Sequence, residues 1–246
     1  AGRFNGPGSM IFDIITVFPE MFAGILDYGI VHRACTSGLV DVRIVNLRDF
    51  ATDRHRSVDD RPYGGGEGMV FMPAPLFEAV EFCRGTRKDT GSRVVLLTPQ
   101  GGTWSQEHAE EFSTISHLIL ICGRYEGVDQ RVIDCLVDSE ISIGDFILTG
   151  GEIPAMVILD SVVRLLPGAL GRWESTINES FSSGLLDHPQ YTRPAEYRGH
   201  AVPEVLLSGN HEKIEQWRKQ KALEKTKRIR PELLEKNQPK IKEHLS

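Results

Sequence analysis

The sequence predicts an α/β protein with a mainly parallel sheet, followed by a small all-helical unit. Short apolar runs alternate with segments of helical periodicity. The runs at residues 93–98 (RVVLLT) and 118–122 (LILIC) are apolar throughout, which is typical of strands covered by helices on both faces. The chain then changes to a polar, basic segment of helical pattern at residues 210–246.

The elements of the body follow from these patterns in order. Strands are expected at residues 11–18, 39–45, 93–98, 118–122 and within 140–148. Helices are expected at residues 19–37, 74–84, 105–115, 128–137 and 153–166. Ser105 or Thr103 can cap the third helix, and Pro154 suits the first turn of the fifth. Such alternation predicts a parallel sheet between helices.

The C-terminal part has a different character. Residues 172–183 are polar and rich in Ser, Thr and Asn, and read as a linker or mobile loop. Residues 210–227 predict an exposed helix with Ile214, Trp217 and Leu223 inward, and residues 232–245 predict a weaker one. Residues 210–246 carry 11 Lys and Arg against 6 Asp and Glu, whereas the whole chain has a net charge of -6. This basic tail fits either a solvated, charge-laced helix or a polyanion-binding surface.

Composition excludes several protein classes. With 40% hydrophobic and 25% charged residues, the chain is neither disordered nor fibrous. No apolar run approaches the roughly 20 residues of a membrane-spanning helix. Cys35, Cys83, Cys122 and Cys135 form no CxxC pair, and the last three lie in apolar patterns that predict burial. We therefore expect a reduced, cytoplasmic protein, with residues 1–9 being an expression scar.

Three Gly-rich stretches follow strand signals, at residues 99–102, 123–127 and 143–151. Ligands of parallel sheets bind at the carboxyl ends of strands, where such loops meet. Each stretch alone could be a tight turn, but three together favour a binding site. The chain has no GxxxxGK[ST] and no GxGxxG fingerprint, which argues against a P-loop or a Rossmann dinucleotide site. The stretch at 63–69 (YGGGEGM) reads as a flexible loop able to close over a substrate.

Asp160 and Arg164 lie four residues apart on an otherwise apolar predicted helix. They share one face, so they either pair with each other or present Arg164 to a developing anion. Pattern alone favours the pairing. The eight His are scattered and no GxSxG is present, so no nucleophilic triad is predicted.

Six motifs, in this order, resemble the bacterial tRNA (guanine-N1)-methyltransferases of the SPOUT class, the TrmD family. They are VDDRPYGGGEGM (58–69), LLTPQG (96–101), CGRYEGVDQR (122–131), SIGDFILTGGEIPAM (142–156), GLLDHPQYTRP (184–194) and VLLSGNH (205–211). The resemblance covers residues 10 to about 230. It implies a trefoil-knotted, S-adenosylmethionine-binding domain at 10–170, a flexible interdomain linker at 171–185 and a helical tRNA-binding domain at 186–246. It also implies a homodimer whose active site is shared between subunits.

The resemblance further implies the site residues. The methyl donor would be held by Leu96, Leu97, Pro99, Gly123, Tyr125, Glu126, Ile143, Gly144, Asp145, Phe146, Ile147, Leu148, Gly150, Gly151 and Pro154. By this resemblance, Arg164 matches the family's catalytic Arg. The resemblance therefore favours a catalytic Arg164 over an Arg164 that only forms an ion pair with Asp160. The family's Asp-Ser-Phe reads Glu179-Ser180-Phe181 here, so Glu179 is the expected general base, with Glu174 and Asp187 as neighbouring alternatives.

The implied reaction methylates N1 of the guanine immediately 3′ of the anticodon, tRNA position 37. The basic tail would bind tRNA phosphates, with Lys219, Lys225 and Arg228 among the contacts. The resemblance also implies assistance by Mg²⁺, although no ligand constellation is visible in the sequence. Two other functions fit the same patterns: a non-catalytic RNA-binding protein on this fold, and a SPOUT methyltransferase with another RNA target.

Overall fold

The computed structural model describes residues 9–87, 91–170 and 179–236. The chain divides into two compact units, residues 1–171 (unit 1) and 172–246 (unit 2). Unit 1 is built on a five-stranded sheet, and all its strand pairs are parallel. The strands are β1 (Met10–Thr16), β2 (Val40–Asn46), β5 (Ser92–Thr103), β6 (His117–Cys122) and β7 (Ser139–Ser142), in the order β2-β1-β6-β5-β7.

β6 lies at the centre of the sheet and is buried at all six of its residues. It pairs with β1 on one side (Ile11 with His117) and with β5 on the other (Ser92 with His117). Its side chains alternate between two cores: Leu118, Leu120 and Cys122 belong to one, and Ile119 and Ile121 to the other. A strand that is apolar on both faces is therefore explained by helices on both faces of the sheet.

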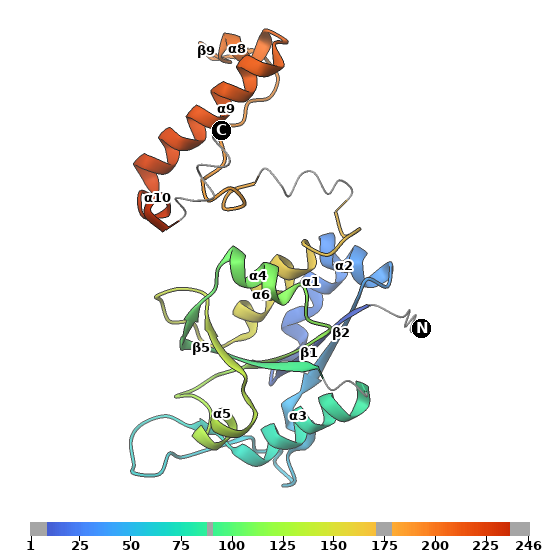
Figure 1. The fold of residues 1–246 in the computed structure, drawn as a ribbon. Helices are drawn as coiled ribbons and strands as arrows, with labels where there is room; N and C mark the ends of the chain where they lie inside the picture. The colour runs from blue at the N-terminus through green and yellow to red at the C-terminus, as the bar shows by residue number, and fades with distance from the viewer. Residues whose placement is uncertain (1–8, 88–90, 171–178, 237–246) are drawn as a thin grey trace. The chain divides into compact units, whose positions relative to one another are not determined.

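The helices form two layers (Figure 1). One layer contains α1 (Ala23–Asp27), α2 (Gly29–Thr36), α4 (Gln106–Phe112) and α6 (Glu152–Val163), and the other contains α3 (Pro73–Arg87) and α5 (Gln130–Leu136). α6 buries Ala155, Ile158, Leu159, Val162 and Val163 against the sheet. The expected α/β class with a parallel sheet is thus confirmed.

The single helix expected at residues 19–37 is wrong. The segment is divided into a 3₁₀ turn, η1 (Pro19–Phe22), followed by α1 and α2. Tyr28 is extended (φ -136, ψ 158), and Gly29 follows at φ 78, a left-handed value that glycine adopts without strain. The apolar spacing is nearly helical on both sides of this break, so periodicity alone does not reveal it.

Burial of the cysteines follows the prediction only in part. Cys83 and Cys122 are buried, but Cys135 on α5 is exposed, so its predicted burial is wrong. Burial raises the pKa of the Cys83 thiol to about 12, and the nearby Asp13 carboxylate adds to the rise. Burial also raises the pKa of Cys122, with a contribution from the charge of Glu152. These two thiols are therefore inert packing groups at neutral pH.

The described part of unit 2 contains α8 (Glu204–Leu207), α9 (His211–Ile229) and α10 (Glu232–Lys236). The side-chain oxygen of Asn210 accepts a hydrogen bond from the Lys213 backbone N–H (3.1 Å) and caps α9. Unit 2 is not all-helical, because β8 (Glu196–Tyr197) and β9 (His200–Ala201) form an antiparallel hairpin. The expectation of a purely helical tail missed this hairpin, since two-residue strands are too short to show alternation.

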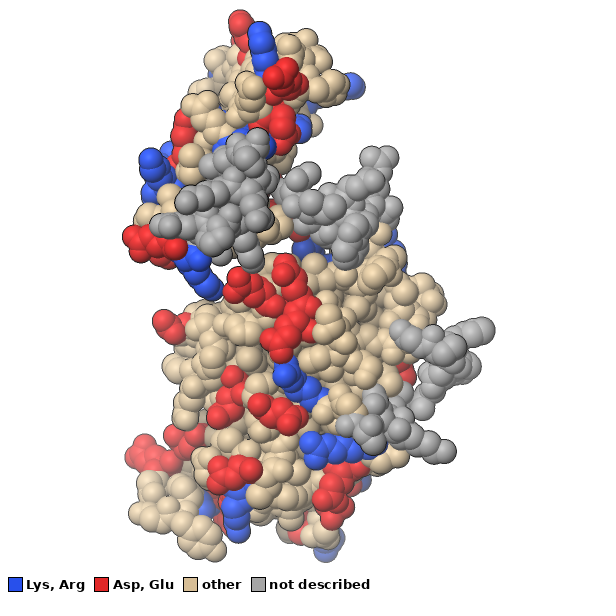
Figure 2. All heavy atoms as spheres, in the orientation of Figure 1, with Lys and Arg blue, Asp and Glu red and all other residues tan. Residues whose placement is uncertain are grey.

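Charge is distributed differently in each unit (Figure 2). Acidic side chains predominate among the charged groups on the visible face of unit 1, whereas basic and acidic side chains are intermixed on unit 2. Within residues 9–87, 91–170 and 179–236, no helix combines the length and hydropathy of a membrane-spanning segment.

Candidate functional site

A cavity of about 510 Å³ opens at the carboxyl ends of β6 and β7 and beside the irregular part of β5. Its walls come from residues 96–100, from the turn after β6 and from the loop after β7. This volume lies within the range of small-molecule sites, about 300–1,000 Å³. The three Gly-rich stretches expected to converge therefore do converge, as the topology of a parallel sheet requires.

The first wall is an irregular part of β5. Leu97 pairs with Ile141 of β7, and Gly102 then pairs with the same residue, so residues 98–101 bulge out of the ladder. Thr98, Pro99 and Gln100 on this bulge line the cavity. A strand was expected to end at Thr98, but β5 resumes pairing after the bulge and ends at Thr103.

The second wall is the turn at residues 123–127. Tyr125 has φ 60, an uncommon value for a residue with a side chain, and its ring contacts Phe71 edge-on with centroids 5.2 Å apart. The backbone N–H of Glu126 donates a hydrogen bond to the Met69 carbonyl oxygen (3.0 Å). The end of the 63–69 loop is therefore tied to this wall of the cavity.

The third wall is the loop at residues 143–151. The Ser142 hydroxyl donates to the Gly144 carbonyl oxygen (3.0 Å), which fixes the start of the loop. At its end, Gly151 is the N-cap residue just before α6, and its N–H donates to the Gly123 carbonyl oxygen (2.8 Å). A Cβ on Gly151 would lie 2.7 Å from the Cys122 Cα, so only glycine lets these two walls approach so closely.

Of the fifteen residues expected to hold the methyl donor, fourteen line the cavity. Asp145 is the exception: it is exposed and is not part of the lining. The lining also contains residues that were not named individually as donor contacts, although Gln100, Arg124, Gly127 and Thr149 lie within the three predicted Gly-rich stretches. The full set is Thr98, Gln100, Arg124, Gly127, Val128, Gln130, Ile133, Glu140, Ile141, Ser142 and Thr149.

Arg164 lies at the C-terminal end of α6, where its backbone N–H donates to the Asp160 carbonyl oxygen (3.2 Å). Arg164 is half-buried, but Asp160 is exposed. Asp160 was expected to be a polar residue on a buried helix. It lies instead on the solvent-facing side of α6. An exposed carboxylate needs no partner to offset a burial cost, which weakens the argument that it must pair with Arg164.

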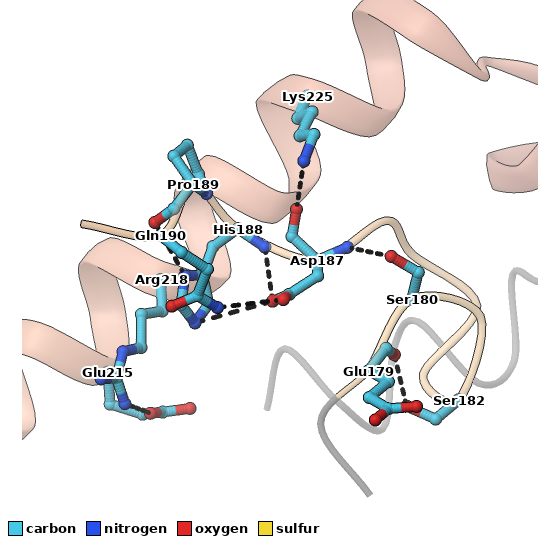
Figure 3. Close-up of polar contacts among 10 residues, drawn as sticks. All are labelled: Glu179, Ser180, Ser182, Asp187, His188, Pro189, Gln190, Glu215, Arg218 and Lys225. Atoms are coloured by element: carbon cyan, nitrogen blue, oxygen red, sulfur yellow. Dashed lines mark hydrogen bonds and ion pairs between the residues drawn. The ribbon is translucent and has the colours of Figure 1, made fainter. Parts of the chain in front are cut away.

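Glu179 belongs to unit 2, at the start of a turn that leads to Leu185 (Figure 3). Its backbone carbonyl oxygen accepts a hydrogen bond from the Ser182 hydroxyl (2.7 Å). Glu179 also lines a small pocket of about 60 Å³ together with Asp187, His188, Arg218 and Lys219. Carboxylates and cations from two segments of unit 2 thus gather around it. Glu174, the other alternative base, lies outside the described residues.

Asp187 is the best-connected side chain of this group (Figure 3). Its carboxylate accepts hydrogen bonds from the His188 backbone N–H (2.7 Å) and the Gln190 amide (3.0 Å), and its own N–H donates to the Ser180 hydroxyl (2.9 Å). Lys225 donates to the Asp187 carbonyl oxygen (3.0 Å). Lys225 therefore holds the 187–188 backbone, and of the three expected tRNA contacts Arg228 is the most plainly exposed.

A second cavity, of about 410 Å³, lies within unit 2. Val202, Leu206, Leu207 and Ile214 provide apolar walls, and His188 and Tyr191 provide aromatic ones. The rings of both contact Trp217, with centroid distances of 6.4 Å and 6.3 Å. Sequence reasoning missed this cavity, because Trp217 reads simply as the inward face of a helix.

Within the described ranges, no three His, Cys, Asp or Glu side chains are arranged to hold a metal ion. The described side chains therefore do not by themselves fit a Mg²⁺ ion.

Comparison with known proteins identifies the family. The sequence model of the family described as tRNA (Guanine-1)-methyltransferase TrmD matches residues 10–236. A tRNA (guanine-N(1)-)-methyltransferase of Geobacillus kaustophilus is 54% identical over 226 residues, covering 92% of each chain. That of Dictyoglomus turgidum is 57% identical over 224 residues, covering 91% of this chain and 89% of its own. With a parallel sheet whose loops enclose a ligand-sized cavity, and with matches of this extent, the chain belongs to the TrmD family of tRNA (guanine-1)-methyltransferases.

Proposed function

We propose that this protein transfers a methyl group from S-adenosylmethionine to N1 of a guanine in tRNA. The guanine is the one immediately 3′ of the anticodon, at position 37, and the products are N1-methylguanine and S-adenosylhomocysteine. The observation that carries the proposal is the cavity of about 510 Å³ lined by three converging loops, in a chain of this family.

The cavity suits an adenosine-bearing donor. Leu96, Leu97 and Pro154 offer apolar side chains for the faces of an adenine ring, and the turns at 123–127 and 143–151 offer backbone N–H and C=O groups for its edge. A sulfonium methyl is already activated, so much of the protein's contribution is to hold it against the acceptor nitrogen. The fifteen predicted residues are proposed as the donor site, including the exposed Asp145, which is not part of the cavity lining.

Two side chains are proposed to act on the guanine. N1 of guanine carries a proton and is a poor nucleophile until the proton is removed. Glu179 accepts that proton as general base, and Arg164 stabilises the negative charge that develops on the base carbonyl oxygen. Asp187 is the alternative base, although its carboxylate already accepts two hydrogen bonds.

We further propose a homodimer in which each active site is completed by the partner subunit. The support is a group of apolar side chains left exposed around α6. Ile153 (48% exposed) and Val157 (39%) lie one turn apart on that helix, and Phe146 (53%) and Ile147 (81%) lie on the loop before it. The trefoil knot implied by the family resemblance is part of the same proposal.

Unit 2 is proposed to bind tRNA in the cytoplasm. Lys219 and Arg228 would contact phosphates, and the aromatic walls of the 410 Å³ cavity suit an unstacked base. Access to N1 requires that the guanine leave its stack, and proteins that read RNA loops commonly hold such bases on aromatic rings.

The test is transfer of labelled methyl from S-adenosylmethionine to tRNA transcripts. A transcript with guanine 3′ of the anticodon should accept label at N1, and the same transcript with adenine there should not. Label on both transcripts would indicate another RNA target. If the donor binds in neither calorimetry nor crystals, the protein is instead a non-catalytic RNA-binding protein on this fold.

A further inference from the structure

Glu152 is a buried carboxylate that the proposed mechanism does not use. It is the first residue of α6, is 1% exposed and does not line the donor cavity. A carboxylate is rarely buried unless hydrogen bonds and a cation compensate for its lost hydration. Its partners therefore indicate what it does.

One partner comes from the cavity wall. Arg124, in the turn at 123–127, donates from Nε to both carboxylate oxygens of Glu152 (3.0 and 3.1 Å), and its Nη2 lies 2.9 Å from Oε2. Arg124 is itself a lining residue of the cavity. The ion pair therefore connects the second wall of the cavity to the first turn of α6.

The other partner comes from the end of β1. The Thr16 hydroxyl, also buried, donates to Glu152 Oε1 (2.7 Å) and accepts from the Phe18 backbone N–H (3.0 Å). The Phe18 ring in turn lies under the Arg124 guanidinium, 4.2 Å from ring centroid to Cζ. Thr16 therefore orients the Glu152 carboxylate. Arg124 is held by that carboxylate and by the Phe18 ring.

The third wall of the cavity lies directly on this ion pair. Arg124 donates from Nη1 to the Thr149 carbonyl oxygen (3.2 Å). A Cβ on Gly150 would lie 2.5 Å from Glu152 Oε2 and 2.6 Å from Arg124 Nε. The backbone at 149–150 therefore takes its position from the two charged side chains.

We propose that Glu152 is a positioning residue for the methyl donor, acting through Arg124, and that Thr16 orients it. Removing the negative charge releases the Arg124 guanidinium, and the turns at 123–127 and 149–151 lose their common anchor. This inference rests on the proposed function, because the affinity it concerns is that for S-adenosylmethionine.

The test is a double-mutant cycle on donor affinity, measured by calorimetry on the full chain. Glu152→Gln should weaken S-adenosylmethionine binding about tenfold, which is about 1.4 kcal/mol. Arg124→Gln should weaken it at least as much. The double variant should bind no more weakly than Arg124→Gln alone, because Glu152 acts only through Arg124. Additive effects of the two substitutions would overturn the proposal.

A matched control separates positioning from loss of stability. Asp13 is also a buried carboxylate, with two hydrogen bonds from Arg43 (2.8 and 2.7 Å), but neither residue lines the donor cavity. Asp13→Asn should lower the melting temperature and leave donor affinity unchanged. Equal losses of affinity in Asp13→Asn and Glu152→Gln would reduce Glu152 to a structural role.

A milder variant covers the case in which Glu152→Gln does not fold. Thr16→Val keeps the side-chain shape and removes only the hydroxyl that orients Glu152, so we expect donor affinity to fall about threefold, equivalent to about 0.65 kcal/mol. Unchanged affinity would remove Thr16 from the proposal. If the unaltered protein does not bind S-adenosylmethionine, the proposed function fails before the cycle is measured, so the two failures are distinguishable.

Discussion

At the scale of single residues, Glu179 is the proposed general base. Its carboxylate stands one methylene further from the backbone than that of Asp would. The adjoining turn is fixed by the Ser182 hydroxyl, which donates to the Glu179 carbonyl oxygen (2.7 Å), so the backbone origin of this longer side chain is defined. A conservative series at this position therefore tests the role of the acid directly.

We expect Glu179→Gln to lower turnover about 10²- to 10⁴-fold, because the amide cannot accept the N1 proton. Glu179→Asp keeps the carboxylate, with a side chain shorter by one methylene, and should keep most of the activity. Donor affinity should be the same in all three proteins, since the cavity lining lies in unit 1. Methyl-transfer rates and calorimetry check this, and full turnover in Glu179→Gln would assign the proton to another group.

Asp13 gives a prediction of pH dependence. Burial alone would raise the pKa of its carboxyl, but hydrogen bonds from His117 and Arg43 outweigh burial and hold the pKa below the usual 3.8. Because the folded-state pKa is lowered, the carboxylate stabilises the fold above the unfolded-state pKa, and this stabilisation is lost as pH falls through the folded-state pKa.

We therefore expect the free energy of unfolding to fall below about pH 4. Asp13→Asn should lower stability by about 3 kcal/mol at pH 7, because it leaves the Arg43 charge without its partner. The variant should also lose the part of the acid dependence due to this group. Denaturant titrations at pH 3 to 7 measure both effects, and parallel curves for the two proteins would contradict the assignment.

Residue roles were the least predictable part of the site. The sequence motifs placed fourteen donor residues on one cavity but did not indicate the link between Arg124 and Glu152. Thr16 and Glu152 are 136 residues apart, and no local pattern encodes such a contact. A usable signal was present nonetheless: an acidic residue at the start of the apolar segment 152–163 calls for a partner.

At the scale of elements, the junction between β6 and α6 determines the shape of the cavity. We expect Gly151→Ala to weaken donor binding and lower the melting temperature, because the added Cβ would meet the Cys122 backbone at 2.7 Å. Neither segment can yield easily, since β6 is fully buried and α6 packs on it. Thermal unfolding and calorimetry measure the two effects.

Gly85→Ala is the matched control for this substitution. A Cβ on Gly85, within α3, meets no atom within 4 Å, so alanine there should stabilise the helix by about 0.5–1 kcal/mol and leave donor affinity unchanged. If both substitutions left binding intact, the close approach at Gly151 would not matter for the cavity.

Elements with strong, uniform patterns were predicted well, and those set by backbone exceptions were not. The run LILIC gave β6, and the apolar segment at 153–166 gave α6 within a few residues of its ends. The break at Tyr28 and the bulge in β5 were missed. The break depends on the dihedral angles of one or two residues, and the bulge depends on pairing with a neighbouring strand. Neither changes the spacing of the hydrophobic residues along the sequence.

At the scale of the whole molecule, the two units differ in the interactions by which each is expected to bind its ligand. The donor cavity is lined largely by backbone and apolar groups, with Arg124, Glu126 and Glu140 as its charged residues, whereas the α9 surface is densely charged. We expect tRNA affinity to fall steeply and log-linearly with salt concentration, while donor affinity changes little. Filter binding and calorimetry across a salt series check this difference.

Lys219→Ala and Arg228→Ala should each reduce the slope of log affinity against log salt by about one, if each side chain neutralises one phosphate. Lys225→Ala is informative by contrast. The Lys225 amine donates a hydrogen bond to the Asp187 carbonyl oxygen. Loss of this amine should therefore disturb the turn around Asp187 as well as any phosphate contact. An unchanged slope in Lys219→Ala and Arg228→Ala would move the tRNA contacts to another surface.

The strand order of unit 1 has a consequence for biosynthesis. β1 emerges from the ribosome before the other strands of this sheet, yet it finds one of its two neighbours, β6, only after about a hundred further residues have been made (Ile11 pairs with His117). At about 5–20 residues per second, that interval is about 5–20 s. During it, one side of an apolar strand has open N–H and C=O groups that can pair with a neighbouring nascent chain. We therefore expect yield of the native protein to depend on translation speed and on chaperones that bind early segments.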